Sequence, residues 1–328
     1  MQTVARENEN EAGADAAGRF EWPELLRTAP APTTISAAAR EALAIAATQR
    51  ASDDLERQRA LCAQVQEELG AVQIARYGVE MAEDRIGGIP VRTFIPCSGD
   101  RPVDAVLLNL HGGGFTKDAG SVTENVPVAG LSGMKVVAVR YRQAPEHPYP
   151  AAVDDAEGVY RALLGTYPAE RICLYGTSAG AILCAQLLGR LACSGAPMPA
   201  ALGFFSGTAD LSRMGDTEQL FRPEADQART EGLFADYIGS HDPADPKVSP
   251  LLGGLSGFPP TLCIAGTRDF LLSQTTLFHR ALLNAGVAAE LVVFEAMLHA
   301  HWIYQDIPES HEAFRIMADF FGRRLGSS

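Results

Sequence analysis

The chain has 328 residues, of which 47% are hydrophobic and 20% are charged, a composition typical of a globular protein with enough apolar material for a large core. A formal net charge of −13 argues against nucleic acid or an anionic membrane surface as a partner. No apolar run is long enough to cross a bilayer, so we expect no membrane partner.

The first residues of the chain are rich in Glu, Ala, Gly and Asn. We expect residues 1–20 to form a disordered tail, because they hold too few apolar groups to pack. They also lack the apolar segment of a signal peptide. The six cysteines show neither a paired nor a zinc-binding spacing. These features together predict a cytoplasmic protein.

Two features follow the tail. Residues 21–70 are rich in Ala, Leu, Arg, Glu and Gln with helical spacing, so we expect one or two helices outside the main sheet. The next segment, GVEMAEDRIGGIPVRTFIP at 78–96, alternates around a Gly-Gly pair. That pattern predicts an antiparallel hairpin.

Beyond residue 101, short apolar runs alternate with helical segments. The runs read AVLLNL, KVVAVRY, RICLYG, AALGFFS, PTLCIAG and AELVVFEA. Buried strands that alternate with helices predict a mostly parallel sheet covered on both faces. Residues 208–250 interrupt the alternation without a strand-like run, so we expect an inserted cap there.

A single serine between glycine corners follows the run RICLYG, in GTSAG at 176–180. Small residues suit a tight strand-to-helix turn, because side chains at Gly176 and Gly180 would collide with neighbouring elements. The turn would raise the Ser178 hydroxyl into a cleft at the carboxyl end of the sheet. It would also point the amide of Ala179 toward a developing oxyanion. Taken alone, so short a motif also occurs in ordinary turns.

A triple glycine follows another strand-like run, in LLNLHGGGFTKD. Its amides are free of side-chain obstruction and would suit an oxyanion, although a flexible turn or a phosphate cradle is the alternative. A Walker-type cradle needs Gly-Lys-Ser/Thr, where this chain has Phe115 and Thr116. We expect His111 to hold the loop rather than to act as a base.

An acid and a base follow the last two strand-like runs. Asp269 comes after TLCIAG and His299 after AELVVFEAML, which gives the chain order of the α/β-hydrolase triad. His299 would then take the proton of Ser178, and Asp269 would fix the tautomer of the ring. The alternatives are a helix cap for Asp269 and His301 as the base. The two histidines near Glu295 lack an evident third ligand, so we expect no metal.

The motifs in combination resemble one family. HGGGF upstream of GTSAG, with YRQAPEHPYPAAVDDA between them, is similar to the hormone-sensitive-lipase-like (bacterial family IV) esterases, in their GTSAG subgroup. The resemblance covers about residues 75–325 and includes DPKVSPLLGGLSGFPPTLCIAGTRD and FEAMLHAHW. It implies an α/β-hydrolase fold, with an eight-stranded, mostly parallel sheet, helices on both faces and a helical cap.

The resemblance also implies the division of the chain and the roles of its residues. The catalytic domain would be residues 71–207 and 251–328, with the cap made from 21–70 and 208–250. The triad would be Ser178, Asp269 and His299, and the oxyanion donors would be the amides of Gly113, Gly114 and Ala179. The implied reaction is hydrolysis of small, short-to-medium-chain acyl esters through an acyl-enzyme, without a cofactor or a metal.

Three departures from the family pattern concern specificity. Thr177 stands where Asp is commoner, Ala300 and His301 replace a glycine and an aromatic residue, and TRDFLLSQ supplies one candidate acid only. His301 would narrow or polarise the pocket. A lactone or amide hydrolase with the same triad, and a non-catalytic ligand-binding protein, are the alternatives. An apolar last strand at the sheet edge would favour a homodimer.

Overall fold

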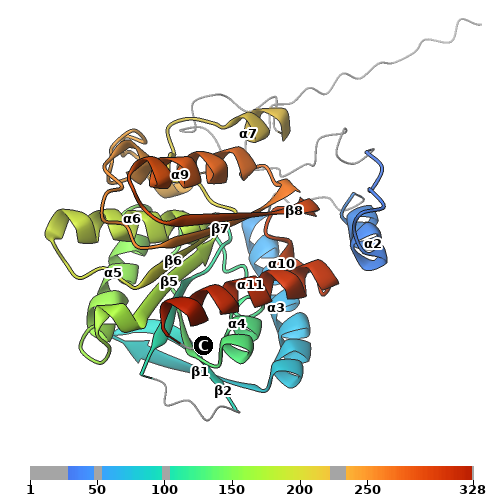
Figure 1. The fold of residues 1–328 in the computed structure, drawn as a ribbon, viewed down its shortest axis with the longest axis horizontal. Helices are drawn as coiled ribbons and strands as arrows, with labels where there is room; N and C mark the ends of the chain where they lie inside the picture. The colour runs from blue at the N-terminus through green and yellow to red at the C-terminus, as the bar shows by residue number, and fades with distance from the viewer. Residues whose placement is uncertain (1–28, 48–53, 98–103, 222–233, 327–328) are drawn as a thin grey trace, which may run out of the picture.

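The computed structural model describes residues 29–47, 54–97, 104–221 and 234–326. The predicted tail, residues 1–20, lies outside these ranges, as does part of the predicted cap insertion. Figure 1 shows a central sheet with helices packed on its two faces. None of the described helices is long and apolar enough to cross a lipid bilayer.

The described residues form an eight-stranded sheet in the order β1-β2-β4-β3-β5-β6-β7-β8. The strands are β1 (Val79–Ile86), β2 (Ile89–Pro96), β3 (Val106–Leu110), β4 (Lys135–Val139), β5 (Ile172–Thr177), β6 (Ala201–Phe205), β7 (Thr261–Arg268) and β8 (Ala289–Leu298). β2 is antiparallel to both β1 and β4, and all the other pairs are parallel. The predicted mostly parallel sheet is confirmed, and β8 lies at its edge as expected.

The predicted hairpin is β1 and β2, joined by two glycines. Ile86 pairs with Ile89, and the residues between them, Gly87 and Gly88, have φ of 59° and 80°. Positive φ at both central positions defines the type I′ turn, which only residues such as glycine adopt without steric cost. The Gly-Gly pair therefore fixes the register of the first two strands.

Helices cover the sheet on both faces (Figure 1). They are α2 (Ala37–Ala46), α3 (Leu55–Tyr77), α4 (Asn125–Ser132), α5 (Ala151–Leu163), α6 (Ala179–Ser194), α7 (Asp216–Phe221), α8 (Ala235–Ile238), α9 (Leu272–Asn284), α10 (His301–Tyr304) and α11 (Pro308–Arg324). One apolar cluster joins the sheet to α5, α6 and α9, and a second joins it to α4 and α11. Alternate residues of β3 enter different clusters: Leu108 packs in the first and Leu107 in the second.

Helix α3, the second of the two described helices that precede the sheet, is longer than expected. Its start is capped by Asp54, whose carboxylate accepts from the N–H of Glu56, and it ends where Gly78 adopts φ of 60°. It therefore continues past the predicted limit of residue 70, since no residue before Gly78 breaks the helix. A side chain at Gly70 would lie 2.7 Å from Val122, which shows how closely α3 approaches the segment before α4.

The segment predicted as a cap insertion contains no strand within residues 208–221 and 234–250, in agreement with its sequence. Helices α7 and α8 and a short 3₁₀ turn, η3 (Pro250–Leu252), lie there instead. Tyr237 of α8 stacks on Phe115, with ring centroids 3.6 Å apart. The segment therefore packs directly on the loop that follows β3.

Candidate active site

Ser178 stands at the turn between β5 and α6 in a strained backbone conformation, with φ of 58° and ψ of −118°. Its N–H donates to the carbonyl of Phe205 at 2.9 Å. A Cβ on Gly176 would lie 2.4 Å from the carbonyl carbon of Gly180, and one on Gly180 would lie 1.7 Å from the oxygen of Leu110. The sequence explanation of the two glycines is thus confirmed: no side chain fits at either corner.

The structure brings the three predicted residues together in one hydrogen-bonded row. His299 Nε2 lies 3.0 Å from Ser178 Oγ, and His299 Nδ1 lies 2.8 Å from Asp269 Oδ1. The carboxylate of Asp269 accepts only, so Nδ1 carries the proton and Nε2 is left to accept from the serine hydroxyl. The Asp269 side chain is fully buried, whereas that of His299 is 16% exposed. The serine thus has a proton acceptor in contact.

The charge of Asp269 is stabilised by its contacts. Burial alone would raise its pKa, but the pairing with His299, the hydroxyl of Ser206 and the N–H of Leu271 outweigh burial and lower the pKa. The N–H of Leu271 donates to Asp269 Oδ1 at 2.8 Å. Helix α9 has Leu271 as its N-cap residue, so Asp269 faces the histidine and does not cap that helix.

His301, the rival base, is packed in the core. Its ring lies 5.2 Å from that of Phe294 and 5.0 Å from that of Trp302, and the residue is 1% exposed. Burial lowers its pKa to about 4, so the ring is neutral at pH 7. No hydrogen bond of the described residues joins it to Ser178. The expectation that His301 narrows or polarises the pocket is therefore wrong, because its ring packs in the core.

The triple glycine forms a loop against the serine turn. Gly113 has φ of 113°, and a Cβ there would lie 2.0 Å from the oxygen of Lys117; Gly114 has φ of 63°. A methyl group on Gly112 would approach the Cβ of Ser178 to 3.6 Å. Ala179 begins α6, so its N–H lies in the first turn, where helices leave N–H groups without an intrahelical acceptor.

The amides of Gly113 and Gly114 are open. No carbonyl within the described ranges accepts a hydrogen bond from the N–H of Gly113 or Gly114. His111 holds the loop, as expected: its Nδ1 donates to the carbonyl of Gly112 at 2.8 Å, and its own carbonyl accepts from the hydroxyl of Tyr141 at 2.8 Å. The two aromatic rings stack with centroids 4.1 Å apart.

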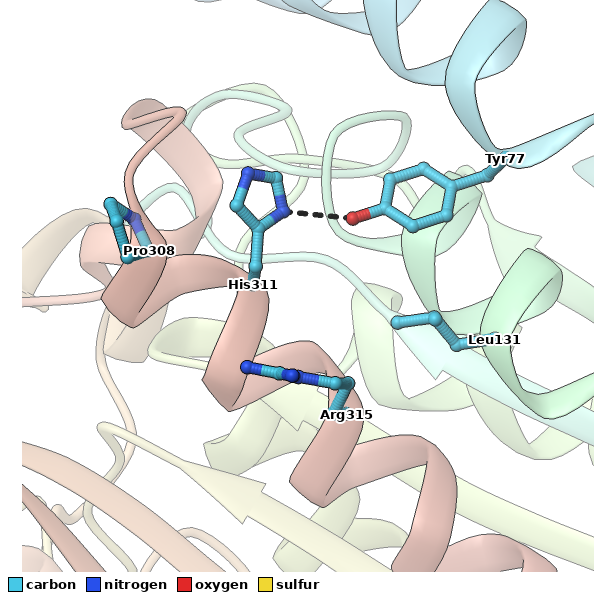
Figure 2. Close-up of a pocket in the computed structure, with 5 residues that line it drawn as sticks. All are labelled: Tyr77, Leu131, Pro308, His311 and Arg315. Carbon is cyan, nitrogen blue, oxygen red and sulfur yellow. Dashed lines mark hydrogen bonds between the residues drawn. The ribbon is translucent and has the colours of Figure 1, made fainter.

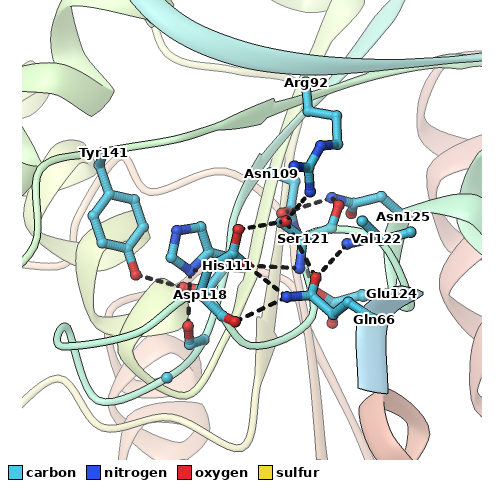
Figure 3. A network of polar contacts seen from close by, with 12 residues as sticks. Gln66, Arg92, Asn109, His111, Asp118, Ser121, Val122, Glu124, Asn125 and Tyr141 are labelled. Carbon is cyan, nitrogen blue, oxygen red and sulfur yellow. Dashed lines mark hydrogen bonds and ion pairs between the residues drawn. The ribbon is translucent and has the colours of Figure 1, made fainter. Parts of the chain in front are cut away.

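Helix α3 supplies a support for the glycine loop that the sequence did not reveal. Gln66 donates to the carbonyl of Asp118 at 2.9 Å and accepts from the N–H of Val122 at 2.8 Å (Figure 3). Arg59 donates to the carbonyl of Thr116 at 2.7 Å. These partners are more than 50 positions apart, so no local pattern could have indicated them.

A hollow of about 370 Å³ lies on a different part of the molecule. It is lined by Tyr77, Leu131, Pro308, His311 and Arg315, from α3, α4 and α11. Figure 2 shows the hydrogen bond of 2.9 Å between the Tyr77 hydroxyl and His311 Nδ1 beside it. The hollow shares no residue with the triad or the glycine loop. The described residues also contain no group of three His, Cys, Asp or Glu side chains suited to a metal.

Comparison with known proteins decides the family. The model of a family with the α/β-hydrolase fold matches residues 107–303, a span that contains the glycine loop and the whole triad. The chain belongs to the α/β-hydrolase fold family. An acetyl-hydrolase of Streptomyces hygroscopicus is 32% identical over 78% of this hydrolase and 92% of that protein. An esterase of Acinetobacter venetianus is 32% identical over 66% and 74% respectively.

Solved structures place the hydrolase in a branch of that family. The crystal structure of esterase E25 has a TM-score of 0.77 and 30% identity, over 90% of this chain and 96% of that one. An esterase from the bacterial hormone-sensitive lipase family has a TM-score of 0.70 and 27% identity, over 85% of this chain and 100% of that one. The predicted resemblance to the hormone-sensitive-lipase-like esterases is confirmed.

Proposed function

We propose that this chain is a serine carboxylesterase that hydrolyses small, short-to-medium-chain acyl esters through an acyl-enzyme intermediate. One observation carries the proposal: the imidazole of His299 is hydrogen-bonded on one side to Ser178 Oγ at 3.0 Å and on the other to Asp269 Oδ1 at 2.8 Å. That row of groups is what activates a serine hydroxyl as a nucleophile. Membership of the hormone-sensitive-lipase-like branch supports the carboxylic ester hydrolase class.

In the first half of the reaction, Ser178 Oγ attacks the ester carbonyl carbon while His299 Nε2 takes its proton. Asp269, whose pKa is lowered by the pairing with His299 in spite of burial, stabilises the imidazolium that forms. The carbon–oxygen bond to the alcohol then breaks. The imidazolium gives its proton to the leaving alcohol oxygen, and Ser178 carries the acyl group.

In the second half, water replaces the alcohol. His299 removes a proton from the water as it attacks the acyl carbon, and the proton is returned to Ser178 Oγ when the acid leaves. We assign the oxyanion in both halves to the amides of Gly113, Gly114 and Ala179. Loss of one such donor typically costs about 100- to 1000-fold in kcat.

The cap would set the size of the acyl group. We assign this role to residues 21–70 and 208–250, because Tyr237 of the second segment stacks on Phe115 beside the glycine loop. The acetyl-hydrolase of Streptomyces hygroscopicus is in keeping with a small acyl group. A cytoplasmic location and a homodimer that pairs through the edge strand β8 belong to the same proposal.

Labelling with a fluorophosphonate probe tests the nucleophile. The wild type should be labelled and Ser178→Ala should not, and equal labelling of the two would contradict the proposal. Hydrolysis of p-nitrophenyl butyrate tests the base, since His299→Ala should lose far more activity than His301→Ala. A rate series from C2 to C12 p-nitrophenyl esters tests the cap, because a maximum at C10 or above would exclude a short-to-medium preference.

A further inference from the structure

A fully buried carboxylate lies behind the proposed active site and takes no part in the steps above. Glu124 precedes α4 and is 0% exposed. Its Oε1 accepts from the hydroxyl of Thr177 and from Trp302 Nε1, the latter at 3.0 Å. Thr177 directly precedes Ser178 in the chain, and Trp302 lies three positions after His299. One carboxylate oxygen thus joins the two segments that carry the nucleophile and the base.

The other oxygen of Glu124 ends a chain of hydrogen bonds that all run in one direction. The hydroxyl of Tyr175 donates to Asn125 Oδ1 at 2.5 Å, and Asn125 Nδ2 donates to Asn109 Oδ1 at 2.9 Å. Asn109 Nδ2 then donates to Glu124 Oε2 at 3.1 Å (Figure 3). Every group points its hydrogen toward the carboxylate, so the network suits an ionised side chain, which only accepts.

Within the described part of the chain, no cation pairs with this charge. None of the ion pairs among the described residues includes Glu124, and burial raises its pKa to about 7 while its three donors hold the pKa down. The titratable groups that face it are Tyr175 of β5, Cys184 of α6 and Tyr304 of α10. Burial raises the pKa of Tyr175 and of Cys184, and a tyrosine hydroxyl such as that of Tyr304 ordinarily has a pKa near 10, so all three groups are neutral near pH 7. An unpaired buried charge opposes folding, and apolar packing would be more stable here.

Both segments that Glu124 joins contain strained backbone. Ser178 has φ of 58° and Ala300, next to His299, has φ of 52°. Residues other than glycine adopt such angles only where their surroundings hold them. The hydrogen bonds from Thr177 and Trp302 to one buried carboxylate provide such a hold on both sides of the contact between Ser178 and His299.

We infer that Glu124 is a positioning residue of the proposed hydrolase, and that its ionised carboxylate fixes the serine turn and the histidine segment relative to each other. The inference rests on the proposed function and adds to it the group that aligns nucleophile and base. The carboxylate touches neither substrate nor reacting atoms. Its effect would therefore appear in kcat and not in substrate binding.

The first experiment compares Glu124→Gln with the wild type on p-nitrophenyl butyrate. Glutamine keeps the shape and the acceptor for Thr177 and Trp302, but it loses the charge and turns an NH₂ toward Asn109. We expect kcat to fall about 10- to 100-fold while KM changes less than about twofold, as misplacement of a reacting group does. Unchanged kcat in a folded Glu124→Gln protein would overturn the inference.

The second experiment follows kcat from pH 5.5 to pH 8.5. Protonated Glu124 resembles glutamine, so the ratio of wild-type to Glu124→Gln kcat should be largest at pH 8.5 and should approach one at pH 5.5. A role in folded-state packing alone would give a ratio independent of pH. A constant ratio would contradict the inference that the ionised form of Glu124 positions the two segments.

Single-group variants keep the test valid if Glu124→Gln does not fold. Thr177→Val and Trp302→Phe each remove one donor and leave the carboxylate, so each should lower kcat several-fold, and Thr177→Ser should restore it to within about twofold. Full activity of both Thr177→Val and Trp302→Phe would overturn the inference.

A matched control removes a hydrogen bond elsewhere. Tyr160→Phe deletes the bond from the Tyr160 hydroxyl to the carbonyl of Pro197 and should lower the melting temperature with kcat unchanged. Fluorophosphonate labelling of the wild type distinguishes a failure of the proposed esterase function from a failure of the positioning role of Glu124. A wild type that neither labels at Ser178 nor hydrolyses the ester rejects the proposed function. An active wild type with an equally active Glu124→Gln rejects only the role of Glu124.

Discussion

The serine turn and the glycine loop lie side by side, but they are held in different ways. The corners of the turn at Ser178 are fixed by backbone sterics, because Gly176 and Gly180 pack against backbone atoms that leave no room for a Cβ. The glycine loop is held by His111 and, from outside, by Arg59 and Gln66 of α3, two residues that precede it by more than 40 positions. Backbone sterics thus shape the serine turn, whereas the glycine loop that carries the proposed oxyanion donors also depends on side chains from a distant helix.

The largest effect is expected from a methyl group on the serine turn. In Gly180→Ala, the new Cβ would lie 1.7 Å from the oxygen of Leu110, so the turn cannot form without moving the strand. We expect at least about a 100-fold loss of kcat, or loss of the fold. Gly189→Ala in the same helix is the control, because its Cβ would meet nothing closer than 3.9 Å. Gly180→Ala with wild-type activity would show that the turn is not held by its own backbone.

A pH effect on stability is expected from Glu124, which joins the serine turn to the segment that follows His299. Its pKa is about 7 in the folded protein because of burial, against about 4.3 for an ordinary Glu. A carboxyl with a raised pKa stabilises the fold when protonated, so this stability is fully present below about pH 4 and is lost as the pH rises through 7. We expect the wild type to gain about 2–4 kcal/mol relative to Glu124→Gln between pH 8 and pH 4.5. Urea unfolding of both proteins across this range measures it, and parallel pH curves would contradict it.

A smaller loss is expected when the outer support of the glycine loop is removed. Gln66→Ala leaves the N–H of Val122 and the carbonyl of Asp118 without their partner, which should cost about 1–3 kcal/mol of unfolding free energy. If α3 positions the loop, kcat should fall as well, by about tenfold. Gln64→Ala is the matched control, since among the described residues the Gln64 side chain hydrogen-bonds only to the exposed Glu68 on the same helix. Equal kcat in the two variants would mean that the loop, like the serine turn, supports itself.

The smallest effect is expected at the far end of α3. Tyr77→Phe removes the hydrogen bond to His311 beside the hollow of Figure 2 and should lower the unfolding free energy by about 1 kcal/mol. Steady-state assays should show an unchanged kcat, because the bond lies far along α3 from Arg59 and Gln66. A clear loss of kcat would extend the influence of the helix to its whole length.

Local sequence was sufficient for the elements that depend on backbone sterics and periodicity. Gly87 and Gly88 predicted the first hairpin, the alternation of apolar runs predicted the parallel strands, and Gly176 and Gly180 predicted the serine turn. The order of Ser178, Asp269 and His299 indicated a convergence that the structure shows as two hydrogen bonds. The end of α3 was missed: the prediction stopped at residue 70, but residues 71–77 contain neither Gly nor Pro, and the helix ends only at Gly78.

Sequence by itself determined the fold class and the three side chains at the strand ends, because strand period, glycine conformation and motif order act over a few residues. Tertiary structure alone decided which helix supports the glycine loop, and that Glu124 joins Thr177 to Trp302. Those outcomes depend on contacts between residues 50 to 180 positions apart. Such contacts form only when the sheet and its helices have packed, and no local pattern encodes them.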